Sequence, residues 1–117
     1  MRVVALHTED GLNLKAWYRE PTRSKLPTII YFHGNAGSIG HRGAIVKPFL
    51  DQGYGVLLVT YRGYSSNPGT PHEKGLYADG RAAIKFLREQ KVPDSCIVLY
   101  GESIGTGVAV QIATEYP

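Results

Sequence analysis

Residues 96–114, CIVLYGESIGTGVAVQIAT, decide the fold. In this stretch the apolar run 98–100 breaks into Gly101-Glu102-Ser103-Ile104-Gly105, and an apolar segment suited to a helix follows at once. The pattern predicts a strand that turns sharply into a helix, with Ser103 on the turn. Glycines two positions before and two positions after the serine leave room for the backbone to double back. The stretch is therefore typical of a nucleophile elbow, in which the serine hydroxyl is held clear of the sheet.

Two other functions are open to a glycine-rich turn of this kind. In a glycine-rich helix N-terminus Ser103 would only cap the helix, but the apolar runs on both sides favour the elbow. A nucleotide-binding turn would need the spacing G-x-G-x-x-G, whereas Ser103 stands where the second glycine would follow Gly101. If the motif is started at Gly105 instead, Val110 stands where the third glycine belongs, and no lysine follows for a Walker-type phosphate loop.

The composition fits a single globular domain. The chain has 117 residues, 43% of them hydrophobic, which is enough for one modest core. Its 13 basic and 10 acidic residues give a formal charge of +3, and the basic side chains are scattered. This distribution predicts solubility rather than a nucleic-acid surface.

Cysteine usage and hydropathy indicate the compartment. The lone cysteine, Cys96, cannot form a disulfide within the chain, and its position at the start of an apolar strand predicts a small buried side chain. The sequence contains no apolar stretch of about 18 residues and no signal-peptide pattern. A cytoplasmic protein without a membrane span is the expectation.

The rest of the chain alternates between strand and helix patterns. Residues 3–7 and 12–19 flank the acidic turn Thr8-Glu9-Asp10-Gly11 and predict an antiparallel hairpin whose inner face carries Leu12, Leu14, Ala16 and Tyr18. Buried strands are predicted at 28–32, 56–60 and 97–100. Helices are predicted at 40–52, where Pro48 would kink or restart the helix, and at 73–90, with an apolar stripe of Leu76, Ala83, Phe86, Leu87 and Gln90. The fold class is therefore α/β: an N-terminal hairpin followed by a parallel sheet with helices on both faces.

A serine nucleophile needs hydrogen-bond donors for the oxyanion that forms on attack. One donor is expected to be the amide of Ile104, directly after the nucleophile. The other is expected from the loop after strand 28–32, and we assign it to the amide of Asn35, with Gly34 and Gly37 lining the substrate site. Both loops follow the carboxyl ends of parallel strands, where open α/β sheets place their sites.

With these residues the sequence resembles the α/β-hydrolase superfamily, specifically its small serine esterase-like branch. The resemblance implies hydrolysis of an ester, thioester or amide bond of a small acyl substrate through an acyl-serine intermediate, without a metal or cofactor. In one place, Ser65, the chain has serine where the family commonly has glycine. The motifs that carry the resemblance stand in the family's order: His33-Gly34-Asn35-Ala36-Gly37, Tyr61-Arg62-Gly63-Tyr64, Gly69-Thr70-Pro71, Gly75-Leu76-Tyr77-Ala78-Asp79 and Gly101-Glu102-Ser103-Ile104-Gly105.

The catalytic triad is incomplete in this sequence. In this fold an Asp or Glu and then a His follow the nucleophile, but after Ser103 there is one acid, Glu115, and no histidine. Glu115 lies roughly 18 Å along a helix from Ser103 at about 1.5 Å per residue, too far to orient a base there. The upstream histidines do not replace the missing base. His33 is expected to brace the oxyanion loop, and His7, His41 and His72 are expected at the surface or on a helix.

The sequence therefore predicts the N-terminal portion of one α/β-hydrolase domain, spanning residues 1–117, with the C-terminal half as a missing partner. Residues 97–100 would form an exposed apolar strand edge, because the strands that flank it in the family are absent. That edge leaves a third possibility open, a non-catalytic piece that binds a partner or itself. Arg62 and Asp79 are expected to pair and to hold the long loop after residue 60 against its helix.

Overall fold

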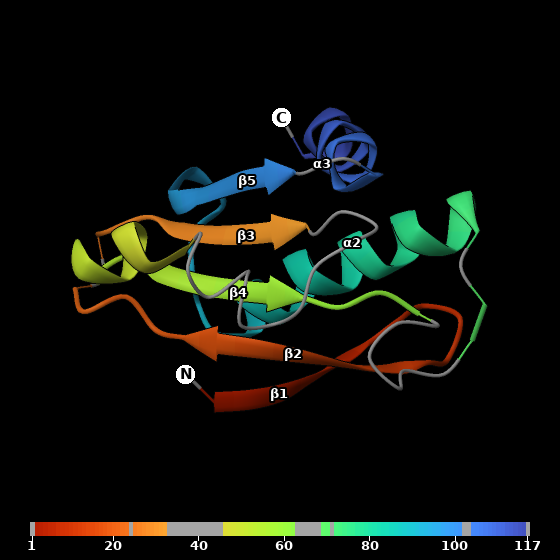
Figure 1. The fold of residues 1–117 in the computed structure, drawn as a ribbon, viewed down its shortest axis with the longest axis horizontal. Coiled ribbons are helices and arrows are strands. Elements are labelled where there is room, and N and C mark those ends of the chain that lie inside the picture. Colours follow the sequence, from red (N-terminus) through yellow and green to blue (C-terminus); the bar gives the residue numbers. More distant parts are fainter. Residues whose placement is uncertain are drawn as a thin grey trace.

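The computed structural model describes residues 2–23, 25–32, 46–62, 69–70, 72–101 and 104–116. The described strands form one five-stranded mixed sheet in the order β1-β2-β4-β3-β5, and helices pack against it (Figure 1). Residues 46–51 are also helical. The elements run β1 Arg2–His7, β2 Asn13–Arg19, β3 Thr28–Phe32, β4 Gly55–Val59, α2 Glu73–Glu89, a 3₁₀ turn Asp94–Cys96, β5 Ile97–Gly101 and α3 Ile104–Glu115.

The N-terminal hairpin is present as predicted. β1 and β2 pair antiparallel, from Arg2 opposite Tyr18 to His7 opposite Asn13. The turn closes with a hydrogen bond of 3.1 Å from the Gly11 amide to the Thr8 carbonyl, and Gly11 has the positive φ of 90° that a side chain would strain. Side chains alternate along β2, so that Leu14, Ala16 and Tyr18 are buried while Leu12 is half-buried against them.

The parallel strands β3 and β4 form the centre of the sheet, and every residue of both is buried. β4 ends at Val59, one residue earlier than predicted, because Val59 already pairs with Phe32, the last residue of β3. Beyond it the Thr60 hydroxyl bonds to the Lys15 carbonyl instead. Continuous burial on both faces is expected of strands covered by helices on each side.

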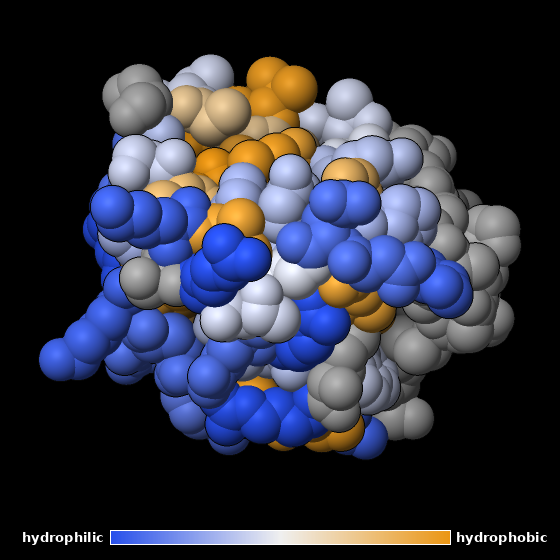
Figure 2. All heavy atoms as spheres, turned by 90° about the vertical axis from the view of Figure 1, so that its left-hand side faces the viewer, coloured by the Kyte–Doolittle hydropathy of each residue, from blue (hydrophilic) through white to orange (hydrophobic). Residues whose placement is uncertain are grey.

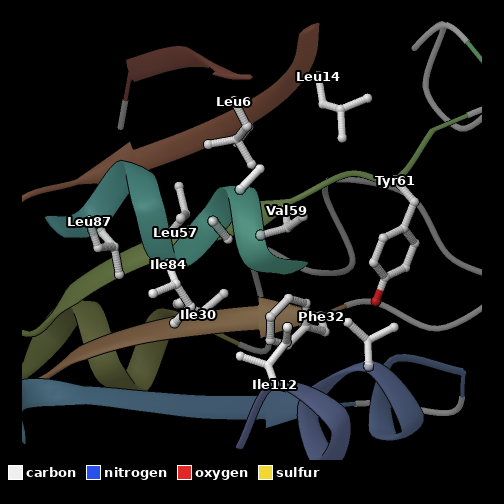
Figure 3. Close-up of a cluster of buried hydrophobic side chains, with 14 of the residues drawn as sticks. Leu6, Leu14, Ile30, Phe32, Leu57, Val59, Tyr61, Ile84, Leu87 and Ile112 are labelled. Atoms are coloured by element: carbon white, nitrogen blue, oxygen red, sulfur yellow. The ribbon is translucent and has the colours of Figure 1, made fainter. Parts of the chain in front are cut away.

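Helices do cover both faces of the sheet. On one face α2 and α3 pack against the hairpin, β3 and β4, and Figure 3 shows their side chains converging there around Ile30, Leu57 and Phe32. On the other face the helical residues 46–51 contribute Val46, which packs against Tyr31 and Leu58. The predicted helix at 40–52 is confirmed over 46–51, whereas 40–45 lie outside the described residues.

The helix α2 matches its predicted range, with one error in its apolar stripe. Ala83 and Leu87 are buried as expected, but Gln90 is exposed because it is the capping residue at which the chain leaves the helix. Cys96 is another correction. Its side chain is half-buried where a buried one was predicted, although its place in the 3₁₀ turn directly before β5 agrees with the prediction. Within the described ranges no helix is long and apolar enough to cross a bilayer.

The edge strand β5 is apolar and partly bare, as the sequence predicted. It pairs with β3 on one side, and no described strand lies on its other side. Val98 is 46% exposed and Tyr100 38% exposed, whereas Ile97 and Leu99 pack against the core. In Figure 2 apolar atoms gather at the top of the visible face, which is the β5 side of the molecule in Figure 1.

Candidate functional site

The candidate site lies where β3 and β5 end. The two strands are parallel neighbours, and their last residues, Phe32 and Gly101, lie opposite each other. β3 and β5 therefore end next to each other at the carboxyl edge of the sheet, where open α/β sheets place their sites. Of the predicted site residues, Ser103, Asn35, Gly34 and Gly37 lie outside the described residues, as does His33. Ile104 is the first residue of α3.

The join between β5 and α3 is very tight. Only two residues separate Gly101, the last of the strand, from Ile104, the first of the helix. A Cβ atom built on Gly101 would stand 2.5 Å from the carbonyl oxygen of Gly105 and 2.7 Å from Cα of Thr106. The strand and the helix can meet in this way only because residue 101 has no side chain. The flanks of the predicted elbow thus have the geometry of a sharp strand-to-helix turn.

The helix that follows the turn is held in place by α2. Val108 and Ile112 on its inner face are buried, and they lie against Gly80 of α2. A Cβ atom on Gly80 would stand 2.8 Å from Cγ1 of Ile112 and 3.0 Å from Cγ1 of Val108. This close approach of the two helices fixes the start of α3 relative to the sheet.

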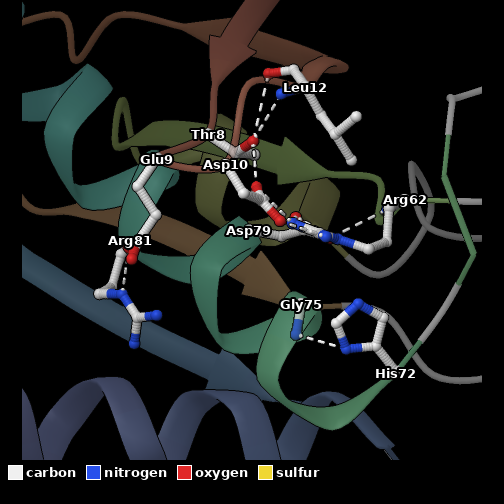
Figure 4. Close-up of polar contacts among 9 residues, drawn as sticks. All are labelled: Thr8, Glu9, Asp10, Leu12, Arg62, His72, Gly75, Asp79 and Arg81. Carbon is white, nitrogen blue, oxygen red and sulfur yellow. Dashed lines mark hydrogen bonds and ion pairs between the residues drawn. The ribbon is translucent and has the colours of Figure 1, made fainter.

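A buried arginine lies at the same edge of the sheet, where the chain leaves β4 (Figure 4). Arg62 is 3% exposed, and its guanidinium bonds to two carboxylates, those of Asp10 and Asp79. We call these three residues the Arg62 cluster. Nε and one terminal nitrogen donate to Oδ1 of Asp79 at 3.0 and 2.8 Å. Both terminal nitrogens donate to Asp10, at 2.6 and 3.0 Å.

The cluster also holds the backbone. The amide of Arg62 donates to Oδ2 of Asp79 at 2.9 Å, so one buried carboxylate binds both the side chain and the main chain of the same residue. The predicted pairing of Arg62 with Asp79 is confirmed. The participation of Asp10 was not predicted, since nothing in the sequence connects residues 52 positions apart.

Glycines make room for the arginine. A Cβ atom on Gly75, in the first turn of α2, would stand 2.8 Å from Cδ, Nε and Cζ of Arg62. The amide of Gly75 in turn donates to Nδ1 of His72, which caps the helix. His72 is exposed as expected, but its capping role is an addition to the prediction.

The charges of the cluster stabilise one another. The hydrogen bonds from Arg62 and Thr8 hold the pKa of Asp10 well below its usual range, and burial opposes them only in part. The hydrogen bond to Asp10 raises the pKa of Arg62 above its already high ordinary value, and Asp79 adds to this against the effect of burial. Both shifts favour the ionised forms of Arg62 and Asp10.

The other candidate acids and bases have separate contacts. His7 is exposed and its Nδ1 bonds to the side chain of Asn13 across the hairpin. Glu115 accepts hydrogen bonds from Arg81 at 3.2 and 3.3 Å, so the only acid after Ser103 is paired with α2. His41 lies outside the described residues. Among the residues that are described, no group of three or more His, Cys, Asp or Glu side chains is placed to hold a metal ion.

Comparison with known proteins agrees with this geometry. Residues 24–117, most of the chain, match the model of the Hydrolase_4 family, described as serine aminopeptidase, S33. The chain belongs to the Hydrolase_4 family. The Hydrolase_4 chain is 41% identical over 118 residues to an uncharacterized protein of Mycobacterium tuberculosis, covering 99% of this chain and 42% of the relative. It is 35% identical to the lysophosphatidylserine lipase ABHD12 of Danio rerio, covering 82% of this chain and 25% of that protein.

Solved structures place the Hydrolase_4 chain in the α/β-hydrolase fold. An esterase of Pyrococcus furiosus, Pf2001, superposes with a TM-score of 0.78 at 26% identity, covering 94% of this chain and 42% of the esterase. An α/β hydrolase of Vibrio vulnificus does so with a TM-score of 0.81 at 32% identity, covering 96% of this chain and 39% of that structure. The sequence thus spans less than half the length of each relative it matches here.

Proposed function

We propose that this chain carries the nucleophile of a serine hydrolase that cleaves carboxylic esters, thioesters or amides of small acyl substrates through an acyl-serine intermediate. Ser103 is the nucleophile, and the amides of Ile104 and Asn35 are the donors to the oxyanion, with Gly34 and Gly37 beside the substrate. Membership of a serine hydrolase family supports the chemistry. The observation that carries the assignment is the tight join of Gly101 to α3, opposite the end of β3.

Esters are the substrates we favour. The relatives of this chain include a lysophosphatidylserine lipase, and a similar structure is that of an esterase. An oxyanion site of two backbone amides can serve esters, thioesters and amides alike, because each forms the same kind of tetrahedral intermediate. The leaving group separates esters from amides, because an ester expels an alcohol more readily than an amide expels an amine, and the names of the relatives favour esters over thioesters.

The base and the acid of the triad are proposed to come from polypeptide other than these 117 residues. A serine hydroxyl without a positioned base is a weak nucleophile. Loss of the base alone lowers turnover by on the order of 10⁶ in a well-studied serine protease. The 117-residue chain by itself is therefore expected to bind substrate weakly and to turn it over very slowly.

Labelling with a fluorophosphonate tests the proposal. The longest natural chain that contains these residues is compared with its Ser103→Ala variant, and with Thr114→Ala as a control that removes an exposed hydroxyl from α3. We expect covalent labelling and hydrolysis of a short p-nitrophenyl ester in the wild type and the control, and neither in Ser103→Ala. Unchanged labelling of Ser103→Ala would show that the nucleophile lies elsewhere.

A second candidate is a non-catalytic module that binds a partner through β5. The exposed side chains of Val98 and Tyr100 favour it, because a bare apolar strand edge is a template for pairing. The same experiment separates the two. A chain that folds, remains unlabelled at Ser103 in its longest natural form and associates through β5 would support the second candidate.

A further inference from the structure

The Arg62 cluster joins segments far apart in the sequence at the edge that holds the proposed site. Asp10 comes from the hairpin turn, Arg62 from the exit of β4, and Asp79 from α2. Val59, three residues before Arg62, pairs with Phe32, which in turn pairs with Gly101. β4, β3 and β5 therefore end at the same edge of the sheet, and Arg62 lies just beyond the end of β4.

The two carboxylates of the cluster do different work. Asp79 is fully buried, and its carboxylate neutralises the guanidinium on the side away from water. Asp10 is 46% exposed, so water screens its ion pair more than that of Asp79, and charge alone does not set its role. Its two parallel hydrogen bonds to the terminal nitrogens instead fix the orientation of the guanidinium plane. Thr8 fixes the carboxylate in turn, donating to Oδ1 of Asp10 at 2.6 Å.

The orientation of that plane is connected to the direction of the backbone. The Asp79 carboxylate accepts hydrogen bonds from both the Arg62 amide and the Arg62 guanidinium. Rotation of the guanidinium would therefore strain the hydrogen bond to the main chain. Gly75 and Gly69 pack closely against the Arg62 side chain, since a Cβ atom on either would stand within 3.2 Å of it. A guanidinium held on both sides thus fixes the point at which the chain turns out of β4.

We propose that Asp10 is a positioning residue of the proposed hydrolase site, acting through Arg62 to hold the chain at the exit of β4 in the orientation that catalysis requires. The proposal rests on the function proposed above. It assigns to the tip of the hairpin, a segment without a predicted catalytic role, an effect on the rate of the acyl transfer. A displacement of about 1 Å in the site, caused by a substitution far from the reacting atoms, can lower the rate about a hundredfold.

The test uses Asp10→Asn in the longest natural chain, with Glu9→Gln as the matched control. Glu9 is in the same turn, loses the same charge, and pairs with Arg81 at 2.6 Å rather than with Arg62. Asparagine keeps the shape of Asp10 but can accept only one of the two hydrogen bonds from the terminal nitrogens. Each rate constant for fluorophosphonate labelling is divided by the folded fraction measured by circular dichroism.

We expect Asp10→Asn to label on the order of tenfold more slowly than the wild type, with kcat for an acyl ester reduced more than KM changes, and Glu9→Gln to match the wild type. Arg62→Lys, which has one compact charge in place of the fork, should be slower still. If Asp10→Asn only lowers Tm while folded molecules label at the wild-type rate, the role is structural and the proposal is wrong.

The outcome for Ser103→Ala distinguishes the two proposals. Loss of labelling in Ser103→Ala together with wild-type labelling in Asp10→Asn overturns the positioning role and leaves the proposed function standing. Wild-type labelling in Ser103→Ala overturns the proposed function, and the positioning role with it.

Discussion

Gly101 and Gly105 lie in contact across the turn between β5 and α3: a Cβ atom on Gly101 would stand 2.5 Å from the carbonyl oxygen of Gly105. The atoms that oppose such a Cβ belong to the backbone of the helix, which cannot swing away as a side chain can. Gly101 is thus required by the closeness of the strand to the helix and not by an unusual φ.

Replacing Gly101 by alanine should therefore push α3 away from β5. We expect destabilisation by about 1–3 kcal/mol, the usual cost of overpacking, and a further loss of labelling at Ser103 because the elbow is displaced. Urea unfolding measures the first effect and the labelling rate per folded molecule the second. An unchanged unfolding midpoint would mean that the contact is looser than the structure has it.

Gly107, in the same helix, should respond in the opposite direction. It is exposed in the interior of α3, and a Cβ atom there would meet nothing within 4 Å. Gly107→Ala should stabilise the protein by about 0.5–1 kcal/mol, because alanine loses less backbone entropy than glycine on entering a helix. The pair Gly101→Ala and Gly107→Ala, compared in one urea series, separates helix propensity from crowding at the elbow.

Lys91 occupies a position that favours glycine. It follows the cap of α2 with φ of 65°, while its amide donates to Arg88 and the amide of Val92 donates to Leu87, which closes a Schellman motif. Lys91→Gly should raise the unfolding free energy by about 1 kcal/mol by relieving the left-handed strain. Lys91→Ala is the control. It removes the charge but keeps the Cβ atom, so a similar gain there would assign the effect to charge instead.

Acid should weaken the attachment of the hairpin turn. The pKa of Asp10 is lower in the folded protein than its ordinary value, mainly because Arg62 donates to its carboxylate. A lowered folded pKa contributes stability that is present above the unfolded value, about 3.9, and is lost as the pH falls below it. The unfolding free energy should therefore fall more steeply below about pH 4 in the wild type than in Asp10→Asn. Thermal melts of both proteins at several pH values between neutrality and acid measure this difference.

If the unfolding free energy falls with pH at the same slope in both proteins, the pKa of Asp10 is not lowered by folding and the prediction is wrong. Asp94 is expected to contribute in the same direction, since its hydrogen bonds from Arg88 lower its pKa as well. An Asp94→Asn variant therefore serves as the comparison for an acid outside the Arg62 cluster.

Much of the fold could be predicted because its signals are local. The buried strand at 28–32 is a continuous apolar run, and α2 has an apolar period and clear turn residues at both ends. The end of β4 was predicted one residue too late, since Thr60 has a strand-like side chain but its hydroxyl bonds to the Lys15 carbonyl, and the last pair of β3 with β4 is Phe32 with Val59. Gln90 has the right spacing for the apolar stripe of α2, but the helix ends at Glu89 and Gln90 is its capping residue.

The candidate site also has a part that local sequence predicts and a part that depends on tertiary packing. The elbow is a local pattern, and its flanks, Gly101 and the start of α3, have the predicted geometry. The share of Asp10 in binding Arg62 could not be predicted, because a contact between a hairpin turn and the end of β4 depends on the packed sheet and leaves no periodic mark in the sequence. The pairing of Arg62 with Asp79 was predicted from the sequence, and the structure confirms it.

The order of the strands sets the direction in which this sheet can grow. α2 carries the chain from β4 past β3 to β5, and α3 lies on the same face as α2. Parallel crossover connections are right-handed in nearly all proteins, so a connection through a helix on that face steps the same way across the sheet. A parallel strand reached from α3 is therefore expected beyond β5, the end of the sheet order at which no further described strand lies. Such a strand would bring its own carboxyl end, and any histidine or acid on the loop there, next to the serine turn.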